Sequence, residues 1–190
     1  MGGSIDDGVR ALRAGRLVVY PTDTLYGLGA RASSTLAVGR LVRAKERPGG
    51  MPISIMLSST EELEEFAALT ETMRAWVRRL LPGPVTVIVP SSPAGRSCMA
   101  SPIVGPSGKL GVRVPDHPAA REIARRVGPV TCTSANRHGA PPAVSLAQAR
   151  SAFGGDVAEY VRGGPAPSGR PSMLVDLTHP APAFVERARR

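Results

Sequence analysis

The sequence predicts a mixed α/β fold, in which an open, twisted mixed β-sheet is flanked by helices. Two observations predict it: short apolar runs suited to buried strands, and amphipathic segments suited to helices that interleave with them. The interleaving lacks the strict repetition of βαβ units, so we expect parallel and antiparallel strands in one sheet. Because no repeat or flexible linker divides the 190 residues, we expect a single domain over residues 1–190.

The helices are predicted from the spacing of apolar residues and from capping residues. Ser4 can cap the first helix, and Ser59 or Thr60 followed by Glu61 and Glu62 indicates a capping box. In chain order, we expect helices over residues 5–14, 34–45, from 59 onward, 71–81, 118–127 and 143–153.

The strands are predicted from short runs rich in Val, Ile and Leu that stand between turn signals. In chain order, they cover residues 17–20, 52–57, 85–89, 110–114, 130–133, 160–161, 173–177 and 184–187. Residues 91–109 carry Gly, Pro and Ser without periodic apolar positions. We therefore expect a mobile loop there, and whether it closes as a lid stays open.

A polar loop follows the first predicted strand, in the sequence RLVVYPTDTLYGLGA from Arg16 to Ala30. Two threonines, Asp23 and the glycines Gly27 and Gly29 stand where the strand ends. Because a glycine lets a ligand approach the backbone closely, this composition suits a small polar ligand. The loop therefore marks a candidate binding site.

The chain is strongly basic, with 24 Lys and Arg residues against 15 acidic ones and a formal net charge of +9. We expect a concave basic face that binds phosphate, either on a nucleotide or along RNA. Most of these residues are Arg, a preference that the composition of a GC-rich genome would also produce. The few aromatic residues argue against a protein that stacks single-stranded bases on aromatic platforms.

The sequence also excludes several classes of protein. No apolar run approaches the ~20 residues that cross a bilayer, and the N-terminus lacks the apolar centre of a signal peptide. We therefore expect a cytoplasmic protein without a membrane partner. Cys98 and Cys132 lack the CxxC spacing of a metal site, so we expect no metal held by the protein itself.

Lys45 and Arg47 lie two residues apart where a predicted helix ends. In a non-helical backbone, their side chains can reach different phosphates, with a guanidinium fork from Arg and a point charge from Lys. Their catalytic role would then be electrostatic, because a transferring phosphoryl group is stabilised by positive charge. A solvated basic patch at a helix C-terminus, favoured by the helix dipole, is the alternative.

Two further predicted strands carry polar residues near their ends. Arg113 stands in an apolar run, where a guanidinium is costly unless it is paired, so we expect it to have a functional partner. Ser134 and Asn136 follow residues 130–133 and offer neutral hydrogen-bonding groups to a phosphate or a base. An ordinary turn is the alternative for this Ser-Ala-Asn segment.

Five motifs, in this order and spacing, resemble the YrdC/Sua5 family. They are PTDTLYGL at residues 21–28, KER at 45–47, PGPVT at 82–86, VRVP at 112–115 and SAN at 134–136. The resemblance runs from Gly15 to the C-terminus, nearly the whole chain. It implies a YrdC-like fold and L-threonylcarbamoyladenylate synthesis, in which L-threonine, bicarbonate and ATP give the mixed anhydride and pyrophosphate. This reaction is the first step of t6A modification at position 37 of tRNA.

The resemblance also implies how ATP is held. Lys45 and Arg47 would be catalytic and would bind ATP, together with Ser134, Asn136 and Arg187. Mg²⁺ would arrive with ATP, because this ion keeps several waters and takes few protein ligands.

The same resemblance assigns the threonine site to Thr24, Arg113, Ser134 and Ser172. Separate t6A-transfer proteins would receive the product, and tRNA is a further candidate partner.

Met51 and Met56 depart from the family pattern, which often has Asn or Lys before the second proline and, in several members, a histidine five residues later. Because Met56 cannot hydrogen-bond threonine as an imidazole would, the identity of the bound amino acid stays open. Two alternatives follow: a YrdC-like enzyme that handles carbamoyl-adenylate, or a non-catalytic module that binds tRNA or double-stranded RNA.

Overall fold

The structure is a computed structural model that describes residues 2–48, 50–101, 103–165 and 167–185. The helices are α1 (Ile5–Arg13), α2 (Thr35–Ala44), α3 (Leu63–Phe66), α4 (Glu71–Leu80), α5 (Pro93–Cys98), α6 (Pro118–Val127) and α7 (Leu146–Phe153), followed by a 3-10 turn, η1 (Gly154–Asp156). The strands are β1 (Val18–Tyr20), β2 (Gly27–Gly29), β3 (Ile55–Met56), β4 (Val85–Pro90), β5 (Lys109–Arg113), β6 (Val130–Thr131), β7 (Thr133–Ser134), β8 (Glu159–Tyr160), β9 (Met173–Asp176) and β10 (Ala183–Val185).

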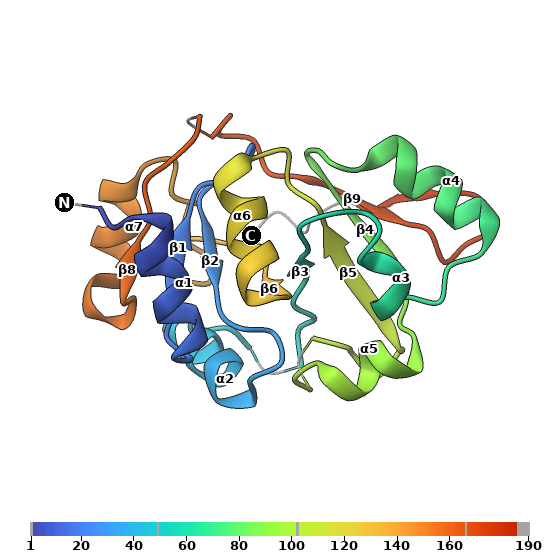
Figure 1. Ribbon diagram of the computed structural model, residues 1–190, viewed down its shortest axis with the longest axis horizontal. Helices are drawn as coiled ribbons and strands as arrows, with labels where there is room; N and C mark the ends of the chain where they lie inside the picture. The colour runs from blue at the N-terminus through green and yellow to red at the C-terminus, as the bar shows by residue number, and fades with distance from the viewer. Residues whose placement is uncertain (1, 49, 102, 166, 186–190) are drawn as a thin grey trace.

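The mixed α/β class is confirmed, but the described strands form two sheets where the sequence predicted one (Figure 1). The smaller sheet has the strand order β7-β2-β1-β8, and the larger one has the order β10-β9-β4-β5-β3-β6. Both are mixed: β1 runs antiparallel to β2 and parallel to β8, while β4 runs antiparallel to β5 and parallel to β9. The prediction of one sheet failed because strands of two to six residues give no signal of which neighbour they pair with.

Helices α1 and α6 pack against each other in front of the four-stranded sheet (Figure 1). Ser4 caps α1 as predicted: its hydroxyl accepts a hydrogen bond from the Asp7 amide, and the Asp7 carboxylate accepts one from the Ser4 amide. The apolar face of α1, Val9 and Leu12, is fully buried in a cluster with Ile123 of α6. Burial of each such side chain contributes about 1.5–3 kcal/mol, which anchors α1 on the sheet.

The six-stranded sheet holds the larger part of the core. Val87, Val112 and Val175, on the neighbouring strands β4, β5 and β9, are buried in one cluster. Helices α3, α4 and α5 lie around this sheet (Figure 1). Burial is deepest in the central strands: Val87, Val89, Leu110 and Val112 of β4 and β5 are fully buried, whereas Phe184 of the edge strand β10 is exposed.

The predicted strand over residues 130–133 is divided between the two sheets. Strand β6 pairs with β3 in the larger sheet, with Val130 opposite Met56, and β7 pairs with β2 in the smaller one, with Ser134 opposite Gly27. Cys132 lies between β6 and β7, where the chain passes from one sheet to the other. This crossing brings polar residues at the end of the run to the boundary between the sheets.

The Gly-Leu-Gly part of the polar loop is a strand, β2, and its glycines serve packing. A Cβ atom at Gly27 would lie 2.8 Å from Tyr20 Cζ, and one at Gly29 would lie 2.7 Å from Tyr20 Cε1. The Tyr20 ring on β1 therefore covers both glycines, and its hydroxyl donates to the Thr131 carbonyl at 3.0 Å. The expectation that these glycines let a ligand approach the backbone is corrected for Gly29, while Gly27 also lines a cavity described below.

Two local predictions differ in detail from the structure. The described residues of 91–109 are mostly loop, as expected, but include helix α5, which is capped by the Ser92 hydroxyl that accepts from the Gly95 amide at 2.9 Å. Helix α3 begins at Leu63 without a side-chain cap, because the Glu62 carboxylate accepts from the Ser58 amide at 3.1 Å instead of forming the expected capping box. Across the described ranges of the chain, none of the helices has the length and apolar character needed to span a membrane.

Candidate functional site

Two adjoining cavities lie at the boundary between the two sheets. The smaller has a volume of about 140 Å³, and the larger about 410 Å³. Both are lined by Cys132, Thr133 and Ser134, the segment where the chain crosses from one sheet to the other. The crossing therefore forms a wall that the two cavities share.

The smaller cavity has a buried, paired arginine at its edge. Arg113 ends β5, and its side chain is 5% exposed. Its Nη1 donates to the Thr24 hydroxyl at 2.7 Å, and its Nη2 donates to the Asp23 carboxylate at 2.6 Å. Both partners come from the loop between β1 and β2, so the guanidinium joins the two sheets. The buried charge is thus paired within the protein, and the expected functional partner of Arg113 stays a prediction.

Two polar atoms of this pair remain unsatisfied. Asp23 Oδ2 and Arg113 Nε are buried and have no hydrogen-bond partner among the residues that the structure describes. A buried polar atom without a partner is costly, so each is a group that a bound ligand or a water would satisfy. Arg113 lines the smaller cavity and Asp23 is not among its lining residues, so the arginine is the member of this pair that a ligand in the cavity would meet.

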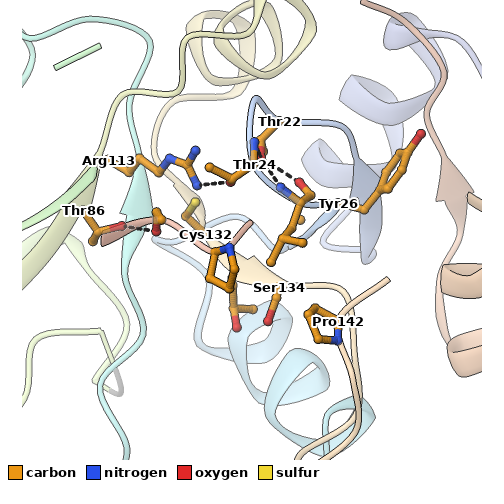
Figure 2. A pocket seen from close by; sticks show the side chains of 13 residues that line it. Thr22, Thr24, Tyr26, Thr86, Arg113, Cys132, Ser134 and Pro142 are labelled. Atoms are coloured by element: carbon orange, nitrogen blue, oxygen red, sulfur yellow. Dashed lines mark hydrogen bonds between the residues drawn. The ribbon is translucent and has the colours of Figure 1, made fainter. Parts of the chain in front are cut away.

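The hydroxyls of the loop form an oriented chain, shown in Figure 2. Thr22 donates its proton to the Leu25 carbonyl at 2.6 Å, so its oxygen must accept from the Thr24 hydroxyl 3.0 Å away. Thr24 in turn accepts from Arg113. This series of hydrogen bonds fixes the Thr24 hydroxyl with its proton directed to Thr22. The Tyr26 ring points away from these groups (Figure 2).

Thr86 and Ser172 line the same cavity from the larger sheet (Figure 2). Thr86 lies in β4 and Ser172 precedes β9, its parallel neighbour, and their hydroxyls are 3.1 Å apart. Neutral hydroxyls of this kind can donate to or accept from a ligand without a large desolvation cost.

The larger cavity is lined by Lys45 and Arg47, which follow α2. Lys45 is 3% exposed, and its Nζ donates to the Ser134 and Asn136 carbonyls at 2.6 Å each. Burial, aided by the nearby Arg47 charge, lowers the pKa of the Lys45 ammonium to about 7. The amine therefore ties α2 to the shared wall, and at neutral pH it exists in both protonation states.

The backbone between the two cations is left-handed, since Glu46 has φ +52°. This conformation is uncommon for a residue other than glycine. It turns the chain directly after Lys45, and the Arg47 guanidinium then donates to the Pro52 carbonyl at 2.6 Å. Both cations line the larger cavity, and their contact with different phosphates stays a prediction.

The Ser-Ala-Asn segment is an ordered part of the shared wall. The Ser134 hydroxyl donates to Asn136 Oδ1 at 2.6 Å, and Asn136 Nδ2 donates to the Arg137 and Ala140 carbonyls. Ser134 lines both cavities and Asn136 lines the larger one. Together with Cys132 and Thr133, Ser134 is therefore a residue that a ligand in either cavity would meet.

The structure thus brings the predicted residues together in two groups. The group at the smaller cavity is Thr24, Arg113, Ser134 and Ser172, and the group at the larger one is Lys45, Arg47, Ser134 and Asn136. Arg187, the remaining predicted residue, lies outside the described residues.

Sequence reasoning placed Asp23 and Thr86 within candidate motifs but gave neither a role, and it misjudged Met56. Asp23 belongs to the same loop motif as Thr24, and a carboxylate near a buried arginine was the signal that could have found it. Met56 is fully buried in the cluster between α1, α6 and the sheets and is not among the residues that line the smaller cavity, whereas Met51 lines the larger one. The argument that Met56 replaces a threonine ligand is therefore corrected.

The fold and the paired cavities define a class: a mixed α/β protein with a small cavity that holds a buried arginine, beside a larger cavity lined by two cations. A sequence model of the Sua5/YciO/YrdC family, described as "Telomere recombination", matches residues 10–188. The chain belongs to this family.

Known relatives cover nearly the whole chain. The threonylcarbamoyl-AMP synthase of Chromohalobacter salexigens is 36% identical over 175 residues, which cover 91% of this chain and 92% of the relative. The threonylcarbamoyl-AMP synthase of Thiobacillus denitrificans is 39% identical over 168 residues, 87% of each. A crystal structure of Pyrococcus abyssi Sua5 complexed with L-threonine is similar, with a TM-score of 0.86, 33% identity and coverage of 95% of this chain. This chain spans about half, 52%, of that longer protein.

Proposed function

We propose that this protein is an L-threonylcarbamoyladenylate synthase. In the reaction, the threonine amine and bicarbonate form a carbamate and water, and a carbamate oxygen then attacks the α-phosphorus of ATP while the bond to pyrophosphate breaks. The observation that carries the proposal is the shared wall at Ser134, which joins a cavity with a buried arginine to one with two cations. The names of the relatives point to the same reaction.

The amino acid would occupy the smaller cavity. Its carboxylate would accept from Arg113, whose Nε lacks a partner among the described residues. The hydroxyls of Thr86 and Ser172, which line the same cavity, would offer further hydrogen bonds to the ligand from the sheet that also carries Arg113. A fixed guanidinium and fixed hydroxyls orient the substrate before reaction, which lowers the entropic part of the barrier.

The phosphates of ATP would occupy the larger cavity. Lys45 and Arg47 would stabilise the negative charge on the transferring phosphoryl group and on the departing pyrophosphate. Because the Lys45 amine already donates to two carbonyls, it would face the phosphates from a fixed position. This chemistry needs no protein nucleophile, since the carbamate supplies the attacking oxygen.

Mg²⁺ would enter with ATP and neutralise phosphate charge. Ser134 Oγ and Asn136 Oδ1 are oxygen atoms of the kind that Mg²⁺ accepts, but they already hydrogen-bond each other at 2.6 Å. We therefore assign the ion to the phosphates and to water, and assign no protein ligand.

Pyrophosphate release from ATP and Mg²⁺ tests the proposal, with threonine or bicarbonate omitted in turn. Release that requires both substrates is the expected result. Release without threonine would favour carbamoyl-adenylate chemistry instead, and no release would favour the non-catalytic RNA-binding alternative. A serine substitute for threonine measures the selectivity of the smaller cavity.

We further propose that the product passes to separate t6A-transfer proteins in the cytoplasm, and that tRNA contacts a basic face. Several surface arginines already pair with carboxylates: Arg74 with Glu64 at 2.8 Å, and Arg125 with Glu122 at 2.8 Å. These pairs are neutral and contribute nothing to the net charge of +9, so the excess positive charge belongs to other basic residues. Retention of tRNA at low but not at high salt would support the basic face, because phosphate contacts release counterions.

A further inference from the structure

Arg137 occupies a position between two helix ends, directly after the Ser-Ala-Asn segment. Its Nη1 donates to the Ala44 carbonyl at the end of α2 at 3.1 Å, and its Nε donates to the Ala152 carbonyl near the end of α7 at 3.0 Å. The guanidinium also lies over the Phe153 ring, 5.9 Å from its centroid. Carbonyls in the last turn of a helix have no partner within the helix, and a cation near them is favourable. Arg137 thus joins α2 to α7.

The same guanidinium contacts the turn that carries the two cations. Arg137 Nη1 lies 2.6 Å from Glu46 Oε1, and Nη2 lies 3.3 Å from Asp156 Oδ2. Glu46 is the residue with positive φ between Lys45 and Arg47. A non-glycine residue in this conformation persists only when its surroundings hold it there. The contact to Arg137 is a direct restraint on that residue.

Further contacts bind the two segments together. The His138 amide donates to the Lys45 carbonyl at 2.7 Å, and the Lys45 amine donates to the Asn136 carbonyl at 2.6 Å. The Lys45–Arg47 turn and the segment of residues 134–138 are therefore held along each other by backbone and side-chain contacts. Arg137 and its partner Glu46 are not among the lining residues given for either cavity, so their contact lies behind the two cations.

We propose that Arg137 is a positioning residue, which fixes the Glu46 turn so that Lys45 and Arg47 face the same cavity. It acts through these two cations and through the helix ends it joins. The proposal rests on the proposed function for its effect on ATP. Its structural part, the placement of Lys45, can be tested without any activity.

The kinetic test compares Arg137→Ala with Arg121→Ala. Arg121 serves as the matched control, because its Nε also donates to a backbone carbonyl, that of Ser58 at 2.9 Å, away from both cavities. We expect Arg137→Ala to raise the KM for ATP about tenfold, the KM for threonine less than twofold, and Arg121→Ala to change neither. An equal rise in both KM values, or the same rise in the control, would show a general loss of structure and overturn the proposal.

The independent test observes Lys45 directly. The sequence has two lysines, Lys45 and Lys109, so isotope-labelled lysine gives two side-chain NMR signals that can be titrated separately. We expect Arg137→Ala to move the pKa of Lys45 from about 7 toward the ordinary value of 10.5, because the loosened amine becomes hydrated. Removal of the positive charge of Arg137 would by itself also raise the pKa of Lys45. A second variant is therefore needed to separate the loss of charge from the loosening of the turn.

Glu46→Ala separates the two causes. Loss of a negative charge alone would lower the pKa of Lys45, whereas a loosened turn would raise it. We expect a rise, and no further rise in the KM for ATP when Glu46→Ala is added to Arg137→Ala. A fall in the pKa, or single-variant effects that multiply in the double variant, would contradict the proposal. If the wild-type protein released no pyrophosphate, the proposed function would fail, while the Lys45 signal would still decide the role of Arg137.

Discussion

Arg113 and Thr24 are joined by a 2.7 Å hydrogen bond between the guanidinium and the threonine hydroxyl. Arg113 ends a strand of the larger sheet, and Thr24 follows a strand of the smaller one. The bond therefore closes the boundary between the sheets at one end of the smaller cavity. The same guanidinium forms the 2.6 Å ion pair with Asp23, so its position depends on both sheets.

Arg113→Lys should weaken binding of the amino acid and spare that of ATP. A lysine keeps the positive charge beside Asp23 but cannot donate to Asp23, Thr24 and a carboxylate with a planar fork. We expect the KM for threonine to rise at least tenfold, which corresponds to ~1.4 kcal/mol, with the KM for ATP unchanged. Steady-state kinetics with each substrate varied in turn measures both. If only the KM for ATP changed, the amino acid would bind elsewhere than beside Arg113.

Arg47→Ala should lower adenylate formation about tenfold or more without unfolding the protein, because it removes a charge from the larger cavity. Arg43→Ala is the matched control, since Arg43 lies in the last turn of the same helix and is not among the residues given as lining either cavity. Initial rates of pyrophosphate release compare the two variants with the wild-type protein, and circular dichroism checks that each variant folds. Full activity in Arg47→Ala would move the nucleotide site away from this turn.

ATP binding should weaken as the pH rises through about 7, because the charged form of Lys45 is lost there. Calorimetric titrations from pH 6.5 to 9 would show the fall, and Lys45→Arg, which stays charged, should show a smaller one. An equally steep fall in Lys45→Arg would assign the titration to another group.

The depressed pKa of Lys45 also affects stability. Between the folded value of about 7 and the ordinary value of 10.5, the unfolded chain binds more protons at Lys45 than the folded protein does. The free energy of unfolding should therefore rise with pH in this window, as burial of the charge ceases to oppose folding. Urea unfolding of Lys45→Met, which has no charge to bury, should lack this rise.

Gly29→Ala should destabilise the fold by about 1–3 kcal/mol, the usual cost of overpacking a core. The added methyl group would meet the Tyr20 ring and Val130 Cγ1, the latter at 2.9 Å. Gly39→Ala is the control, because a Cβ there meets its nearest atom at 3.7 Å in the middle of α2. Replacing a helical glycine should stabilise the protein by up to about 1 kcal/mol. Urea unfolding compares the two, and a neutral Gly29→Ala would contradict the packing role.

Much of the local structure could be predicted from the sequence. The helix over residues 118–127 begins and ends where the apolar spacing and Pro118 indicated, and Ser4 caps α1 as its position suggested. These elements are defined by neighbours within a few residues, so the local pattern contains the information.

The division into two sheets could not be predicted in this way. Cys132 stands between two strands of two residues each, β6 and β7. Strand β6 pairs with β3 and β7 pairs with β2, and the sequence of β2 was interpreted as a loop. The sequence predicted Lys45 as a binding residue. It did not predict that the Lys45 amine contacts the Ser134 and Asn136 carbonyls, because these residues lie some 90 positions away and meet it only in the tertiary structure. Long-range pairing of this kind leaves no local signal.

The most direct test follows the carbon atom of labelled bicarbonate. The protein is incubated with labelled bicarbonate, L-threonine, ATP and Mg²⁺, and the nucleotide products are separated at once and analysed by mass spectrometry. We expect one labelled product that contains both threonine and AMP, formed in step with pyrophosphate and strongly reduced in Arg113→Lys. A labelled adenylate without threonine, or AMP without label, would contradict the assignment of the smaller cavity to the amino acid.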